Sequence, residues 1–252
     1  MNKICLLYQP SGLGDILFLQ KICKHYHNLG YKIIFPVVYE FEWLNNYIEN
    51  VEFISWEDKE KKLSWGDTLP DNIKFPKKEY YRSNQESIFT DDFIYINFFK
   101  PPQGRTMSVK YDMLGLDYED WADYLTFNRN KEKEDNLFYN ILGLKDDEEY
   151  LFVNDNFQTR PHPMKFPYMY RDIPNDKKIV NLQLIDGYSI FDWCKVIEKS
   201  SGIYMIESSL NYVLESKEMR DKLPKNLNLY SRNNNFWEVE YLFNIPWKYR
   251  IL

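Results

Sequence analysis

The stretch that decides the fold is Ile4-Cys5-Leu6-Leu7-Tyr8 followed by the turn Gln9-Pro10-Ser11-Gly12-Leu13-Gly14-Asp15. A continuous apolar run of this length is typical of a strand that is buried on both faces of a sheet. Pro10 and Gly12 end the run, and Asp15 is of a residue type that is favoured where a helix starts. We therefore expect a strand, a tight turn and a helix, in that order.

The same alternation continues through the first half of the chain. The expected helix ends at Gly30, and strands are expected at residues 32–38 and 51–56 with a short helix between them. The apolar residues that would form the core face of the first helix are Ile16, Leu19, Cys23 and Tyr26. Strands that alternate with helices are the pattern of a parallel sheet, so the chain belongs to the α/β class.

The second half repeats this organisation. Ser189, with Asp192 three residues later, is typical of a helix start, and the polar segment 128–135 is the best candidate for a crossing between domains. The sequence therefore predicts two Rossmann-like parallel-sheet domains, spanning residues 1–130 and 131–252. The strands expected in the second domain are residues 150–153, 178–184, 203–206 and, as the last strand, 227–230, with helices at 136–142, 208–216 and 237–243.

Composition narrows the classes of protein. The 252 residues carry a net charge of -6, and Lys and Arg form no block, which argues against a nucleic-acid partner. Cys5, Cys23 and Cys194 form no CxxC pair, and we expect them to be buried thiols in a reducing compartment. No run approaches the roughly 20 apolar residues that a transmembrane segment needs. The expected protein is soluble and cytoplasmic.

The first candidate site is the loop between the first strand and the first helix. Gly12 and Gly14 allow a sharp turn and leave room for a ligand, and ligands of open parallel sheets bind at this edge. The loop is not a dinucleotide fingerprint, because Leu17 stands where a third small residue is needed, and no Gly-Lys-Ser/Thr follows. The alternative is a tight turn in which Asp15 caps the helix.

The second candidate site lies where a buried strand meets a helix in the second half. Ser208 and Ser209 would stand at the start of that helix, where hydroxyl and N–H groups suit a diphosphate. Glu207, at the end of the strand, could accept hydrogen bonds from a ribose or a sugar. The alternative is an ordinary serine cap beside an exposed glutamate.

A third candidate is the polar segment 154–160, which directly follows an expected strand. Arg160 could make a bidentate contact to a phosphate, and the alternative is a solvated loop. Histidines and cysteines show no metal-ligand spacing, and the acidic pairs are more typical of solvated faces. No metal site is therefore expected.

Taken together, the two βα halves, the Gly-Leu-Gly-Asp loop at residues 12–15 and the Glu-Ser pair at residues 207–208 resemble the GT-B glycosyltransferases. Among them, the chain is most similar to the heptosyltransferase-like glycosyltransferase family 9. In that family the loop aspartate is implicated as the base for the acceptor hydroxyl, and Asp15 matches it. The family's donor motif is an acidic residue, a Ser or Thr, Gly-Pro and a His. Here Ser209-Leu210 replaces Gly-Pro, and no His follows.

The resemblance implies two compact domains facing a cleft. It implies a metal-independent, inverting transfer of a sugar from a nucleotide-diphosphate sugar to a hydroxyl of a glycan or glycoconjugate, with no other cofactor. Asp15 would be the catalytic base. The loop residues expected to contact the acceptor substrate are Ser11, Gly12, Leu13 and Gly14. The residues expected to bind the donor are Asn154, Thr159, Arg160, Glu207, Ser208, Ser209 and Asn211.

Two other classes of protein remain open on the sequence. One is a non-catalytic module that binds a nucleotide sugar or a glycan through the same loops. The other is a structural protein that keeps a degenerate transferase fold, which predicts no stabilisation by any nucleotide. A flavodoxin-like cofactor protein explains less, because it leaves the second βα half without a role.

Overall fold

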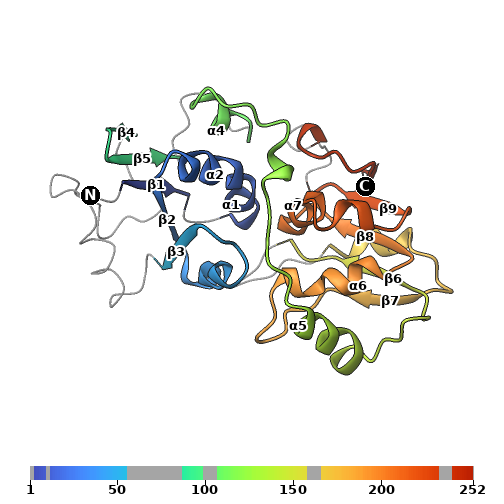
Figure 1. The fold of residues 1–252 in the computed structure, drawn as a ribbon. Helices are drawn as coiled ribbons and strands as arrows, with labels where there is room; N and C mark the ends of the chain where they lie inside the picture. Colours follow the sequence, from blue (N-terminus) through green and yellow to red (C-terminus); the bar gives the residue numbers. More distant parts are fainter. Residues whose placement is uncertain are drawn as a thin grey trace. The chain divides into compact units, whose positions relative to one another are not determined.

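The computed structural model describes residues 3–9, 12–55, 87–98, 107–157, 166–232 and 240–251. The chain forms two compact units, Met1–Leu125 and Thr126–Leu252, and each is built around its own five-stranded sheet (Figure 1). The sequence placed the boundary slightly later, between residues 130 and 131. The protein is of the mixed α/β class with largely parallel sheets, as the alternation of strands and helices predicts.

The sheet of the first unit has the order β3-β2-β1-β5-β4. Its strands are β1 (Ile4–Tyr8), β2 (Lys32–Val37), β3 (Val51–Ser55), β4 (Ile88–Phe89) and β5 (Phe93–Asn97). β1 lies in the middle and pairs in parallel with both β2 and β5. Among the described strands, only the short edge strand β4 runs antiparallel. β1 is buried along its whole length, as its continuous apolar run predicts.

The helix expected after the first turn is divided in two at Leu19, into α1 (Leu13–Phe18) and α2 (Gln20–Asn28). Gly30 follows α2 with a φ of 87°, the left-handed conformation that is common just beyond a helix. The expected core face is confirmed, since all four of its residues are buried: Ile16, Leu19, Cys23 and Tyr26.

The described part of the first unit also contains η1 (Tyr39–Asn46), α4 (Val109–Asp112) and η2 (Trp121–Asp123). The last two pack on α1 through aromatic rings. The Phe18 ring centroid lies 4.9 Å from that of Tyr111 and 5.3 Å from that of Trp121. The Tyr111 hydroxyl also donates a hydrogen bond to the carbonyl oxygen of Phe18. These contacts fix α4 beside α1, at the end of that helix.

The sheet of the second unit has the order β10-β9-β8-β6-β7, and all its described pairs are parallel. Its strands are β6 (Tyr150–Asn154), β7 (Lys178–Asn181), β8 (Gly202–Ile206), β9 (Leu227–Tyr230) and β10 (Lys248–Arg250).

Two strand expectations for the second unit are wrong. β7 ends at Asn181 rather than residue 184, because the Asn156 side chain, not a neighbouring strand, binds the carbonyl of Leu182. β9 is not the last strand, since β10 follows it. β10 has three residues, none of them buried, so it carries no apolar pattern that the sequence could reveal.

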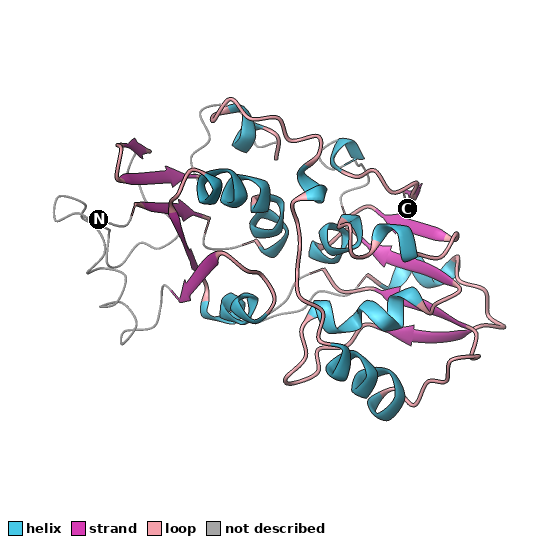
Figure 2. Cartoon of the chain, in the orientation of Figure 1, coloured by secondary structure: helices cyan, strands magenta, loops and turns pink. Residues whose placement is uncertain are grey.

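Short helices alternate with these strands (Figure 2). The predicted start at Ser189 is confirmed, because its hydroxyl accepts the N–H of Phe191 and Asp192 accepts the N–H of Ser189. Of the helix expected at residues 237–243, the structure describes only η7 (Glu240–Leu242), and residues 237–239 lie outside the described residues. The other helical segments are α5 (Lys131–Asp135), η3 (Asn136–Ile141), η4 (Pro167–Arg171), η5 (Ile190–Trp193), α6 (Cys194–Glu198), α7 (Ser209–Glu215) and η6 (Arg220–Lys222).

Each sheet has a point where the chain reverses the direction in which it adds strands. In the first unit β1 lies between β2 and β5, and in the second unit β6 lies between β7 and β8. Ligands of such sheets bind beyond the carboxyl ends of the strands at this switch point. The loops after β1 and β5, and those after β6 and β8, are therefore the places to look for a site.

No helix in the described residues is long and apolar enough to cross a membrane. Cys5, Cys23 and Cys194 are buried and unpaired, as the sequence predicts. Burial raises the pKa of each of these thiols, which makes them unreactive core residues.

Candidate functional site

We call the edge of each sheet where the carboxyl ends of its strands meet the ligand edge. In the first unit, this edge carries a buried polar cluster beyond the end of β1. Lys110, on α4, donates a hydrogen bond to Gln9 Oε1 at 3.1 Å and forms an ion pair with Asp15 Oδ1. The Lys110 side chain is 8% exposed and the Asp15 side chain is 34% exposed. The cluster therefore holds a buried cation whose counter-charge reaches solvent.

Gly12 decides where the second oxygen of Asp15 lies. It has a φ of 82°, and a Cβ atom at this position would collide with Asp15 Oδ2. Asp15 stands in the first turn of α1. Lys110 binds Asp15 Oδ1. Because residue 12 is a glycine, no side chain at that position covers the other carboxylate oxygen, Oδ2. The loop is thus both a tight turn and the support of one carboxylate.

The other loop residues contribute less through their side chains. Leu13 is buried in the core and Gly14 is half-buried, so each could contact a ligand only through its backbone. Ser11 lies outside the described residues. Lys110 was missed by the sequence reasoning, because nothing local indicates which lysine, 95 residues along the chain, packs against Asp15.

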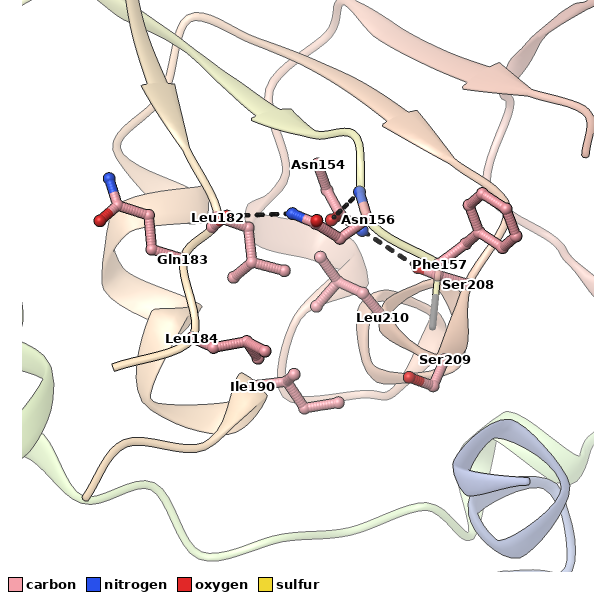
Figure 3. A pocket seen from close by; sticks show the side chains of 10 residues that line it. All are labelled: Asn154, Asn156, Phe157, Leu182, Gln183, Leu184, Ile190, Ser208, Ser209 and Leu210. Carbon is pink, nitrogen blue, oxygen red and sulfur yellow. Dashed lines mark hydrogen bonds between the residues drawn. The ribbon is translucent and has the colours of Figure 1, made fainter. Parts of the chain in front are cut away.

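The second unit has a hollow at the carboxyl ends of β6, β7 and β8 (Figure 3). It encloses about 50 Å³, and about 460 Å³ when the space open to solvent is included. Four aliphatic side chains point toward one another across it: Leu182, Leu184, Ile190 and Leu210. Its polar lining consists of Asn154, Asn156, Gln183, Ser208 and Ser209, with Phe157 beside them. An apolar bed with polar groups to one side is typical of a small-ligand site.

Hydrogen bonds between loops fix the polar side of this hollow. Asn154 Nδ2 donates to Ser208 Oγ at 3.1 Å, which joins the ends of β6 and β8. Asn154 Oδ1 accepts the N–H of Asn156 at 3.1 Å. Asn156 Nδ2 then donates to the carbonyl of Leu182 at 3.3 Å, which extends the network to the end of β7. Three of the sequence-predicted donor residues, Asn154, Ser208 and Ser209, are thereby brought to one hollow.

Asn211 and Glu207 are placed differently from the residues of the hollow. Asn211 is fully buried, and its Oδ1 accepts the N–H of Ser208 at 2.8 Å, so it shapes the loop at the start of α7. Glu207 Oε1 accepts a hydrogen bond from Arg232 at 3.3 Å. Thr159 and Arg160, the remaining predicted donor residues, lie outside the described residues.

Arg232 is a second residue that the sequence reasoning missed. It follows β9, and its guanidinium carbon lies 5.9 Å from the ring centroid of Phe157, which follows β6. Its position after a strand of a parallel sheet was the available signal. Within the described ranges, no three His, Cys, Asp or Glu side chains are grouped so that they could hold a metal ion.

The strand orders and the two ligand edges define a protein made of two doubly wound α/β units. No family model matches the sequence, and no curated protein sequence matches it. The solved structure of the glycosyl transferase family 9 protein from Veillonella parvula DSM 2008 is similar, with a TM-score of 0.54 and 9% sequence identity over 91% of this chain and 81% of that chain. The chain therefore has the fold of a glycosyl transferase family 9 structure, as the resemblance predicts.

Proposed function

We propose that this chain is a glycosyltransferase that moves a sugar from a nucleotide-diphosphate sugar to a hydroxyl group of a glycan or glycoconjugate. The observation that carries the proposal is the fold likeness to the V. parvula glycosyl transferase, which extends over both units. The hollow at the carboxyl edge of the second sheet supports it, since the neighbour's class of enzyme needs a donor site.

On this proposal the donor binds to the second unit. The nucleoside lies on the aliphatic bed of the hollow, and its sugar and phosphates face Asn154, Ser208 and Ser209. The Ser209 hydroxyl makes no hydrogen bond within the described residues, so it is available to a ligand. Thr159, Arg160, Glu207 and Asn211 belong to the same proposed donor set, Asn211 through the loop that it shapes.

The proposed chemistry is a direct displacement. Asp15 Oδ2 takes the proton of the acceptor hydroxyl, and the freed oxygen attacks the anomeric carbon from the face opposite the phosphate. The bond from that carbon to the phosphate oxygen breaks, and the nucleoside diphosphate leaves with the electron pair, so the anomeric configuration is inverted.

The proposal keeps the transfer metal-independent. In the sequence, no apolar strand ends in an Asp-x-Asp pair of the kind that holds a divalent ion beside a diphosphate. Charge on the leaving group would instead be stabilised by the polar groups at the carboxyl edge of the second sheet.

A thermal-shift panel tests the donor. UDP, GDP, CDP, ADP and their sugars are each added to the purified protein, and a ligand at a hundred times its dissociation constant adds about 2.7 kcal/mol of stability. One nucleotide family is expected to stabilise the protein. A flat panel across all of them contradicts the proposal.

The donor found in this way is then used to test the base. Asp15→Asn is expected to lower sugar transfer by about 100-fold or more, since general-base catalysis contributes about that much. Asp112→Asn, an exposed residue on α4, is the matched control and is expected to keep parental activity. A folded Asp15→Asn protein with parental activity shows that Asp15 is not the base.

A further inference from the structure

Arg232 lies at the ligand edge of the second sheet. It stands two positions beyond the last residue of β9, and its guanidinium lies near the ring of Phe157, which follows β6. β8 lies between β9 and β6 in the sheet, so the contact with Phe157 and the hydrogen bond to Glu207 place the guanidinium near the carboxyl end of β8. The guanidinium is thereby carried toward the β6–β8 switch point, beside the loop that contains Ser208.

The guanidinium is held in place but is far from saturated. Its hydrogen bond to Glu207 Oε1 is 3.3 Å long, beyond the usual length for a charged pair, and Glu207 is its one hydrogen-bonding partner in the described part of the chain. A guanidinium has five N–H donors, so most of them face water or a ligand. The Arg232 side chain is 39% exposed, whereas that of Glu207 is 11% exposed.

We propose that Arg232 binds the diphosphate of the donor and that Glu207 is its positioning partner. This inference rests on the proposed function for the identity of the anion. Free N–H donors in a planar fork match the oxygens of a diphosphate, and the partly buried Glu207 carboxylate fixes the side chain at the switch point before the anion arrives. Phe157 packs along the guanidinium and limits its motion.

The competing interpretation is that Arg232 and Glu207 form a surface ion pair without a ligand. An ion pair this exposed contributes little to stability. Without a ligand at the pair, loss of the arginine would leave the binding of every probe unchanged. The two interpretations differ in one measurable respect. A diphosphate-binding arginine affects ligands that carry phosphate and leaves the matching nucleoside unaffected.

Calorimetric titration of the full chain separates them, with inorganic pyrophosphate, the stabilising nucleoside diphosphate and its nucleoside as probes. Arg232→Gln is expected to lower the affinity for the two phosphate-bearing probes by about 10- to 100-fold, which is the usual contribution of a charged hydrogen bond. Its affinity for the nucleoside is expected to stay unchanged. Arg232→Lys is expected to bind the phosphate-bearing probes with an affinity between those of the parent and Arg232→Gln, because an ammonium cannot bind two oxygens in a fork. Lys248→Gln removes the same charge at the amino end of β10, the opposite edge, and is expected to bind like the parent.

The outcomes separate this inference from the proposed function. Nucleotide binding that is equally tight in the parent and in Arg232→Gln overturns the inference and leaves the transferase proposal standing. Pyrophosphate binding that depends on Arg232, without binding of any nucleotide, supports the anion site and contradicts the donor assignment. Binding of no probe by the parent overturns both. Equal weakening of nucleoside and nucleotide indicates a structural role for Arg232 and also overturns the inference.

Discussion

The ion pair of Asp15 and Lys110 should give an asymmetric response to mutation, because its two members differ in exposure. Asp15→Asn leaves the ammonium of Lys110, whose side chain is 8% exposed, with Gln9 Oε1 at 3.1 Å as its remaining hydrogen-bond partner in the described part of the chain. An unpaired charge buried to this degree costs about 3 kcal/mol. Lys110→Met leaves a carboxylate that is 34% exposed and can be hydrated, at a cost of about 1 kcal/mol.

The double variant removes both charges and should cost about 2 kcal/mol, mostly from lost packing and the lost hydrogen bond between Lys110 and Gln9. The coupling free energy is then about 2 kcal/mol, well above the roughly 0.5 kcal/mol error of additivity. Urea denaturation of the parent, the two single variants and the double variant at pH 7 measures it, with Asp112→Asn as the surface control. A Lys110→Met variant that is less stable than Asp15→Asn, or a coupling within that error, would refute the reasoning.

Two further predictions concern the turn and the end of the second unit. Gly12→Ala should destabilise the protein more than Gly30→Ala does; both glycines have positive φ, of 82° and 87°, at a cost of about 1–2 kcal/mol, but only at position 12 would the new Cβ collide with Asp15. Equal losses in urea denaturation would contradict this. Glu215 is buried, accepts the N–H groups of residues 244–245, and has a pKa raised by burial from 4.5 to about 7. Its contribution to stability is therefore full below pH 4.5 and is lost as the pH rises through about 7, by about 3 kcal/mol in all. Glu215→Gln should flatten the dependence of stability on pH between 5 and 8, and an unchanged slope would count against this assignment.

Local pattern was sufficient wherever one segment carries its own physical cause. The apolar run of β1 requires burial on two faces, and the spacing from Ile16 to Tyr26 requires a helix with one core face. Ser189 and Asp192 satisfy the free N–H groups of a helix start within four residues of each other. Such features depend on neighbours in the chain, so the sequence alone predicts them.

The sequence pattern did not predict the strands whose existence or bounds depend on groups far away in the chain. β10 consists of three residues without buried side chains, and it is a strand because its backbone pairs with β9. β7 ends early because the amide of Asn156 takes a carbonyl that a longer strand would have paired. Neither partner can be identified from the residues of the element itself.

By itself, the sequence determined the α/β class, the glycine turn with Asp15 at the first ligand edge, and the serines at the second edge. Those features follow from backbone conformation and hydrophobic periodicity, which are local. Only the tertiary structure showed that Lys110 binds Asp15 and that Arg232 lies beside Phe157 and Glu207. The physical reason is that the strand order, which no single segment encodes, decides which distant side chains meet at the carboxyl edge of a sheet.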